Sequence, residues 1–471
     1  MNKTTLATAI LVALSAGLIG VPSAQQFVAR DPGLRGGPAG AGGALNGLSS
    51  AQKAFFVAGL ADFEEREGIA DGLGPRFNLD SCGGCHLQPA NGGSSPAVNP
   101  QVAIATFNGA RNVVPSFITK NGPVREARFV RNADGTPDGG VHTLFVISGR
   151  NDNNGPGSDA RGCTVKQEDF ETQVRNKNVI FRIPTPTFGL GLIEQISDHD
   201  LVANQAAAAP QKAALGIGGR FNRTRTSSTG SSVSGEMNRS DNDGTITRFG
   251  WKAQNKSLLI FSGEAYNVEM GITNDAFQNE RDENPTCQFV NVPNDTVTDD
   301  GDASGAEARQ AIELFTLFMR FSAAPTPSPE RPGGTASIAN GRKVFENVGC
   351  ALCHTPTFYT SKMSAVSALR SKPVNLFSDL MLHAMGPGLA DGVSQGAASG
   401  DEFRTAPLWG LGQRIFFLHD GRTKDLAEAI QAHKSGATRT YPASEANGVI
   451  NNYNSRSERE KQDLLNFLRS L

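Results

Sequence analysis

Two places in the sequence combine cysteine and histidine at a spacing that has a specific chemical use. Residues 82–86 read CGGCH and residues 350–354 read CALCH. In a CxxCH motif both thiols lie on one turn of the chain, so both can form thioether bonds to a haem, and the adjacent histidine can ligate its iron. The sequence therefore predicts two covalently bound c-type haems. The residues concerned are Cys82, Cys85, His86, Cys350, Cys353 and His354, with His86 and His354 as proximal iron ligands.

Other uses of paired cysteines fit the sequence less well. A thioredoxin-type dithiol needs only CxxC, with no histidine directly after it. A Cys2His2 zinc site needs further ligands at finger-like spacing, and the sequence has none. Four of the six cysteines and two of the seven histidines fall in the two motifs, so chance is a poor explanation.

The N-terminus has the composition of an export signal. Lys3 gives a positive start, Leu6 to Val21 are apolar and uncharged, and small residues follow. We predict a signal peptide over residues 1–24 and a periplasmic protein. An uncleaved membrane anchor is less favoured because the apolar stretch is short, and no later segment approaches a membrane span.

Composition bounds the function further. The chain has 471 residues, of which 38% are hydrophobic, enough for more than one buried core. The formal net charge of −2 gives no reason to expect nucleic acid as a partner, since binding it needs a concentrated basic surface.

The order of predicted elements repeats. Each half reads as a helix, a CxxCH motif, loops and a terminal helix, which resembles the order of a class I cytochrome c. We therefore predict a mainly α fold of two class I cytochrome-c-like domains, residues 25–324 and 335–471, joined by a Pro-rich linker at 325–334. The first domain carries a large insertion of loops and short strands, including 142–148 and 178–183. The predicted helices cover residues 49–67, 306–323, 337–348 and 457–471, and residues 25–48 are expected to be a loose Gly/Ala-rich arm.

A weaker repeat supports a duplication. Trp251 is followed seven residues later by Leu258, and His419 is followed seven residues later by Leu426. Both pairs stand late in their halves, ahead of the terminal helix.

Beyond these patterns, the sequence resembles the di-haem oxidoreductases related to bacterial di-haem cytochrome c peroxidases and to MauG. The resemblance covers nearly the whole mature chain, and the peroxidases themselves are matched only in motifs. Its strongest pieces are FEEREGIADGLGPRFNLDSCGGCH, FGWKAQNKSLLIFSGEAYNVEMGITN, GRKVFENVGCALCH, LHAMGPGLADG and EFRTAPLWGLGQRIFFLHDGRTKDLAEAIQAH.

The resemblance implies roles for three further residues. In the peroxidases a glutamate over the N-terminal haem moves a proton between the peroxide oxygens, and the matching residue here is Glu269. Trp251 aligns with a tryptophan that passes electrons between haems. His433 stands where the peroxidases place the methionine that ligates the C-terminal haem, with Met385 as its rival. Because Met/His ligation raises a haem potential, a bis-histidine haem should have a lower one.

Several ligands stay open at the level of sequence. The first iron could be five-coordinate or take His142, His199 or a methionine, while His383 and His419 are expected to shape the second haem pocket without binding iron. The resemblance implies calcium near the domain interface, without a clear oxygen-ligand loop in the sequence. Cys163 and Cys287 remain, and we favour a disulfide between them in an oxidising compartment.

The resemblance favours a peroxidase-like enzyme. Peroxide or another small oxidant would react at the N-terminal haem, and the C-terminal haem would relay electrons from a small donor protein, either a cytochrome or a cupredoxin. The alternatives are a di-haem electron-transfer protein without peroxidase activity and a MauG-like oxidase of a protein substrate.

Overall fold

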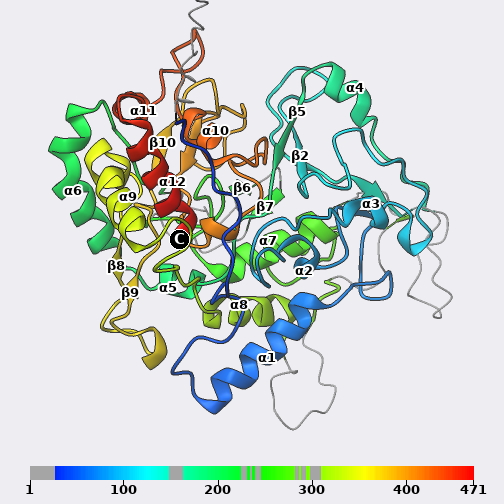
Figure 1. Cartoon of the computed structure of the whole chain (residues 1–471). Coiled ribbons are helices and arrows are strands. Elements are labelled where there is room, and N and C mark those ends of the chain that lie inside the picture. Colours follow the sequence, from blue (N-terminus) through cyan, green and yellow to red (C-terminus); the bar gives the residue numbers. More distant parts are fainter. Residues whose placement is uncertain are drawn as a thin grey trace, which may run out of the picture.

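The computed structural model describes residues 27–147, 163–223, 231–233, 236–238, 245–281, 286–287, 293–296 and 309–471. The predicted signal peptide at 1–24 lies outside the described residues. Helices predominate in the described part, and its strands form only small two- and three-stranded sheets (Figure 1). None of the helices there combines the length and the apolarity that crossing a membrane requires.

In chain order, the helices are α1 (Ser50–Glu64), α2 (Cys82–Cys85), α3 (Gln101–Ile104), α4 (Phe170–Arg175), α5 (Leu190–Glu194), α6 (Asp198–Ala214), α7 (Leu258–Met270), α8 (Ala311–Phe321), α9 (Thr335–Val348), α10 (Leu426–Gln431), α11 (Asn447–Asn454) and α12 (Glu458–Ser470). The strands are β1 (Arg76–Phe77), β2 (Glu126–Phe129), β3 (Val141–His142), β4 (Phe145–Val146), β5 (Val179–Arg182), β6 (Ser231–Val233), β7 (Glu236–Asn238), β8 (Phe358–Tyr359), β9 (Pro373–Val374), β10 (Leu382–Ala384) and β11 (Glu402–Arg404). The 3-10 turns are η1 (Phe107–Gly109), η2 (Cys350–Leu352), η3 (Ser367–Leu369) and η4 (Leu411–Gln413).

Two helix pairs frame the molecule. Helix α1 packs along α8, and α9 packs along α12 (Figure 1). Each pair makes its closest approach at a glycine: a Cβ on Gly59 would overlap the carbonyl oxygen of Leu314, and one on Gly341 would overlap that of Asp463. The capping box predicted at the start of α12 is present, with Ser457 accepting from the backbone of Glu460.

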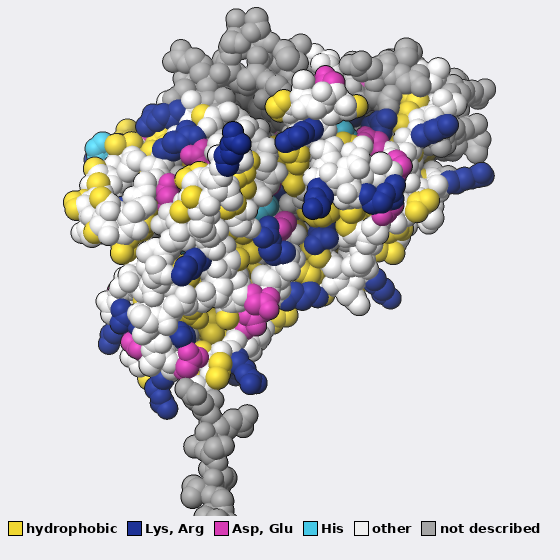
Figure 2. Space-filling view, turned by 90° about the horizontal axis from the view of Figure 1, so that it is seen from above, with side chains coloured by type: hydrophobic (Ala, Val, Ile, Leu, Met, Phe, Trp, Pro, Cys, Tyr) yellow, Lys and Arg dark blue, Asp and Glu magenta, His cyan; other side chains and the backbone are white. Residues whose placement is uncertain are grey.

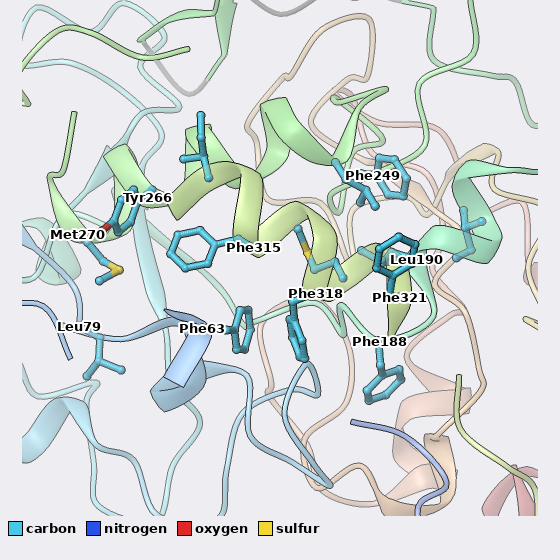
Figure 3. Packing of buried hydrophobic residues seen from close by; sticks show 14 of the residues in the cluster. Phe63, Leu79, Phe188, Leu190, Phe249, Tyr266, Met270, Phe315, Phe318 and Phe321 are labelled. Atoms are coloured by element: carbon cyan, nitrogen blue, oxygen red, sulfur yellow. The ribbon is translucent and has the colours of Figure 1, made fainter. Parts of the chain in front are cut away.

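Phenylalanine packing fixes each pair. In the first half Phe63 of α1 faces Phe315 and Phe318 of α8, with a centroid distance of 4.6 Å to Phe318 (Figure 3). In the second half Phe345 of α9 meets Phe467 of α12 at 5.4 Å. All five rings are buried, so each helix pair closes over its own apolar cluster.

The insertion in the first half contains the predicted short strands. β2 is the central strand of the antiparallel sheet β3-β2-β5, and β1 pairs with β4. The part of the predicted run 142–148 that reaches Ser148 lies outside the described residues. Cys163 and Cys287 form a disulfide, as the sequence predicted.

The weak repeat corresponds to a shared local structure. Phe249 bridges to Asn255, and Phe417 bridges to Thr423, so both segments close a turn over six residues. A capped helix then begins nine residues after each phenylalanine, α7 in the first half and α10 in the second. The repeat therefore reflects structure as well as spacing.

Two predictions about the N-terminal part of the chain were wrong. The arm is not loose: Asp31 forms an ion pair with the buried Arg469 of α12 at 2.6 Å, and Ala44 bridges to Ser322. A coil segment with few apolar side chains is held here by buried polar contacts, which a compositional argument overlooks. The first helix also ends earlier than predicted, because Glu65 is extended.

The surface carries both signs of charge. Lys and Arg side chains are spread over the face in Figure 2, with acidic and hydrophobic side chains between them.

Candidate haem sites

The first CxxCH motif opens onto a cavity in the N-terminal half. The cavity has about 1190 Å³ of empty space, counting its open mouth, and lies among α2, β2, the end of β5, α7 and α8. Cys82, Cys85 and His86 line it together with Phe63 and Phe315.

The local backbone holds the His86 ring in the orientation that an iron ligand requires. α2 is a single turn, and the His86 amide donates to the carbonyl of Cys82 at 3.0 Å. The Nδ1 of His86 donates to the Gly93 carbonyl at 3.1 Å, which leaves Nε2 free of a proton and able to bind a metal. Burial lowers the pKa of His86 to about 4, so the ring is neutral. Burial also raises the pKa of the Cys85 thiol well above its ordinary value, unlike a reactive redox dithiol.

The second motif repeats this arrangement. It opens onto a cavity with about 1320 Å³ of empty space, lined by Cys350, Cys353 and His354. The His354 amide donates to the Cys350 carbonyl at 2.9 Å, and its Nδ1 donates to the Phe377 carbonyl at 3.0 Å. Burial lowers the pKa of His354 to about 4 and raises that of Cys350 to about 12. All four motif cysteines are free of disulfides.

Both candidate sixth ligands reach the second cavity. His433 and Met385 line it. The Nδ1 of His433 donates to the Ala429 carbonyl at 2.8 Å, so its Nε2 is also left as an acceptor. Burial lowers the pKa of His433, and its proximity contributes to the lowered pKa of His354. His433 thus has the same backbone anchoring as the two proximal histidines.

Glu269 lies in the first cavity at the end of α7. Asn78 donates its Nδ2 to Glu269 Oε2 at 2.6 Å. Burial, followed by the charge of Glu126, raises the pKa of Glu269 to about 8. The residue matched from the resemblance is therefore a half-buried carboxyl facing the space beside the first motif.

Trp251 lies between the two cavities and lines both. Its Nε1 donates to the Ile183 carbonyl at 2.9 Å, which fixes the ring. The ring meets His419 edge to face at 6.4 Å, and His419 stacks on Phe403 in the second cavity at 4.4 Å. Trp251 and His419, which hold equivalent positions in the sequence repeat, are thus in contact.

Two of the open choices for the first iron do not lie in the cavity. His142 has both ring nitrogens bound to carboxylates, Nδ1 to Glu168 and Nε2 to Asp138, each at 2.9 Å. The side chain of His199 is 89% exposed. Neither histidine is therefore available to an iron held at the first motif. The methionines that line the cavity are Met270 and Met319.

His383 lines the second cavity with both nitrogens engaged, Nδ1 by Glu445 at 2.7 Å and Nε2 by Asp379 at 3.1 Å. Burial opposes the protonated form of His383, but the nearby Cys353 and the carboxylate of Asp379 outweigh it and raise the pKa. His383 therefore shapes the pocket, as predicted.

Sequence reasoning missed the buried arginines. Arg404 and Arg414 line the second cavity, and burial lowers the pKa of each to about 10. No carboxylate among the described residues pairs with either, although Arg404 donates to the Gly250 carbonyl at 2.9 Å. Arg125, which is half-buried, lines the first cavity, and its Nε has no hydrogen-bond partner in the part of the chain that the structure describes. Haem carries two propionates, and buried guanidinium groups are their natural partners, so the donor set fits haem. Single arginines at such positions give no signal of this role in the sequence.

A calcium site finds less support. Within the described residues, no group of three His, Cys, Asp or Glu side chains is placed to hold a metal ion.

Two similar cavities, each with a backbone-anchored histidine and a pair of free thiols, have the side chains that two haem sites would need. Residues 131–471 match the family described as "Di-haem oxidoreductase, putative peroxidase", and the chain belongs to this family. The match begins after the first CxxCH motif.

The comparisons with curated proteins and solved structures add little to this family assignment. No curated protein matches the chain. Among solved structures, a hydrazine synthase from Kuenenia stuttgartiensis pressurised with xenon is 18% identical with a TM-score of 0.27, covering 49% of this chain and 72% of that one. A MauG-like protein associated with microbial copper homeostasis is 18% identical with a TM-score of 0.23; it covers 34% of this chain, which spans about half (52%) of that chain. Both similarities are too weak to bear on the function.

Proposed function

We propose that this chain is a periplasmic di-haem c-type cytochrome with peroxidase-like activity. Each half, residues 25–324 and 335–471, is a class I cytochrome-c-like haem domain, and residues 325–334 link them. The observation that carries the proposal is the pairing of a CxxCH motif with its own cavity in both halves, with a half-buried carboxyl, Glu269, facing only the first.

The division of labour follows from what lines each cavity. A haem attached at Cys82 and Cys85 supplies an iron at which peroxide can bind and be reduced. Cleaving peroxide requires a proton to leave the oxygen near the iron and reach the departing oxygen. Glu269 is suited to carry that proton, because its raised pKa lets it hold or release one near neutral pH.

The second cavity is suited to electron relay. His354 and His433 would both be available to hold its iron, and the haem would supply electron transfer. Trp251 would connect this haem to the first. A small electron-donor protein, a cytochrome or a cupredoxin, would deliver the electrons to the second half.

One observation favours a second candidate function. Met270 and Met319 line the first cavity, and a thioether from either could close the sixth position of the iron. The protein would then be a di-haem electron-transfer protein without peroxidase activity. A high-spin ferric signal in the optical spectrum of the holoprotein would exclude this alternative, because such a signal requires an iron with an open coordination position.

Covalent haem tests the assignment of the cofactor. The protein denatured in detergent should stain for two haems per chain. Replacing both Cys82 and Cys85 with alanine should remove one, and the Cys350/Cys353 pair the other, because each thioether pair anchors its own haem. Zinc in place of haem would refute the assignment.

The Glu269→Gln variant tests the proposed peroxidase activity. The amide keeps the shape of the side chain and removes its titratable proton, so peroxide turnover should fall about 10²–10⁴-fold, the usual contribution of a general acid–base group. Haem content and the spectrum of the second haem should not change. Equal turnover in the mutant, or no peroxide binding by the wild type, would favour the electron-transfer alternative.

A further inference from the structure

A buried lysine from the first half of the sequence lies beside the second haem site. Lys212 stands in the last turn of α6, and its Nζ forms an ion pair with Asp379 Oδ2 at 2.7 Å. The side chain of Lys212 is 3% exposed, and that of Asp379 is fully buried. Lysine is almost never fully buried unless its charge is paired. The Asp379 carboxylate therefore holds this cation inside the protein, and the proposed function gives neither residue a role.

Helix α6 packs on the second half although it comes from the first. It lies at the outer edge of the second half in Figure 1 and contacts η2, the turn of the second CxxCH motif. Asn204 of α6 donates its Nδ2 to the Oγ1 of Thr355, the residue after the motif, at 3.1 Å. After the helix, Arg220 bridges to Leu382 of β10, the strand that also carries His383. Helix α6 and the segment after it are therefore part of the surroundings of the second haem site.

Asp379 lies on the segment that anchors the proximal histidine of the second site. The Phe377 carbonyl in this segment accepts the hydrogen bond from His354 Nδ1. Two residues later, the Asp379 amide donates to the Cys353 carbonyl at 2.8 Å. The carboxylate is thus buried next to a residue that would bind the haem. Buried charges are screened much less than exposed ones, so a charge at this place would act strongly on the haem.

Two more side chains complete this charge cluster. His383, which lines the second cavity, is bonded at Nε2 to Asp379 and at Nδ1 to Glu445. Glu445 also accepts from the Gly218 amide at 3.1 Å, in the segment that follows α6. Lys212 is the cation that the first half contributes to the cluster. Whatever the charge of His383, replacing Lys212 with a neutral side chain leaves the cluster more negative by one unit.

We propose that Lys212 is a positioning residue that sets the reduction potential of the second haem, because its cation neutralises Asp379 beside the haem. Ferric haem carries one positive charge more than ferrous haem, so an unpaired carboxylate next to it would stabilise the ferric form and lower the potential. Lys212 removes this effect and keeps the haem easier for the donor protein to reduce. The inference rests on the second haem of the proposed function and not on the peroxidase activity, so it is tested without turnover.

The test is a redox titration of the holoprotein followed by EPR, which resolves the two ferric haems. Lys212→Met keeps the length of the side chain and removes its charge. At the potential where the second haem of the wild type is half reduced, its ratio of ferrous to ferric form should fall about tenfold or more, which is about 59 mV for a one-electron couple. Lys212→Arg keeps the charge and should keep the potential close to that of the wild type. Lys343→Met, at an exposed position of α9, is the matched control and should leave the potential in place, because exposed charges are screened.

A further variant covers the case in which Lys212→Met does not fold, since breaking a buried ion pair is strongly destabilising. Lys212→Gln can still donate a hydrogen bond to Asp379 but carries no charge, so it should lower the potential in the same way.

Each outcome decides the inference. An unchanged potential in the neutral variants overturns it, as does an equal fall in Lys212→Arg or in Lys343→Met. If the protein stains for no haem at Cys350 and Cys353, the inference fails together with the assignment of the second haem. A potential that falls only in the neutral variants, in a protein that does not turn over peroxide, would sustain the role of Lys212 and refute the peroxidase.

Discussion

His433 and Met385 both reach the second cavity, and only one of them can take the sixth position of an iron held by His354. The hydrogen bond from His433 Nδ1 to the Ala429 carbonyl favours histidine, since metal-ligating histidines are oriented by such a partner on the other nitrogen. The hydrogen bonds of Met385 are made by its backbone: its amide donates to the Asp401 carbonyl at 2.9 Å, and its carbonyl accepts from Ser435 at 3.1 Å.

Replacing His433 with methionine should raise the potential of the second haem and move its spectrum towards Met/His character. The rise should be a fraction of the roughly 0.8 V that axial ligands span. Redox titration followed optically measures both changes. Met385→Ala is the matched control and should leave the spectrum unaltered. If instead Met385→Ala changes the spectrum and His433→Met does not, methionine is the ligand.

Residues adjacent in sequence could be recognised before the structure, and residues brought together by folding could not. The CxxCH motifs are local, so their thiols and histidines were evident. Arg404 ends the short strand β11 and Arg414 follows the 3-10 turn η4, and no sequence pattern distinguishes either from other arginines. Their significance depends on burial beside a cavity, which one sequence does not reveal. The sequence repeat placed Trp251 and His419 at equivalent positions in the two halves and did not predict their contact.

At the scale of elements, the two helix pairs pack in the same way, with a glycine at the point of contact. Gly59 lets α1 approach α8, and Gly341 lets α9 approach α12, in each case against a backbone carbonyl. Such close contact holds in place the helix, α1 or α9, that leads into each CxxCH turn. Capping and apolar periodicity predicted these helices well, because both signals are local. The pairings of β2 were not predictable, because its partners lie outside any sequence window.

Gly341→Ala should destabilise the protein although alanine is the better helix former. In an open helix this change stabilises by about 0.5–1 kcal/mol. Here the new methyl group would overlap the Asp463 carbonyl, and overpacking of this kind costs about 1–3 kcal/mol. The free energy of unfolding from denaturant titration measures the difference. Asn340→Ala, at an exposed position of the same helix, should cost nothing. A stabilised Gly341→Ala would mean that the helices are not in contact there.

At the scale of the whole molecule, the two halves meet at the space between their cavities. Among the described residues, Trp251 is the one that lines both. Close to Trp251, Arg182 and Lys252 both form ion pairs with the buried carboxylate of Asp391, Arg182 at 2.7 Å and Lys252 at 3.2 Å. These ion pairs join the first half to the second, so the orientation of the two cavities is fixed by buried charge as well as by packing.

If Trp251 carries electrons between the haems, its replacement should slow that transfer and leave each haem intact. Trp251→Phe keeps an aromatic ring but loses the indole and its bond to the Ile183 carbonyl. We expect transfer to slow by about tenfold or more, equivalent to about 1.4 kcal/mol of barrier. Rapid reduction of the second haem, followed by the spectrum of the first, measures the rate.

The sequence supplies its own control, because it contains one other tryptophan. Trp409 is buried in the core and is absent from the lining of both cavities, so Trp409→Phe perturbs packing without touching the path. It should leave the rate of transfer unchanged even if it lowers stability. Should Trp251→Phe transfer electrons as fast as the wild type, or should both variants slow it equally, the electrons take another route between the halves.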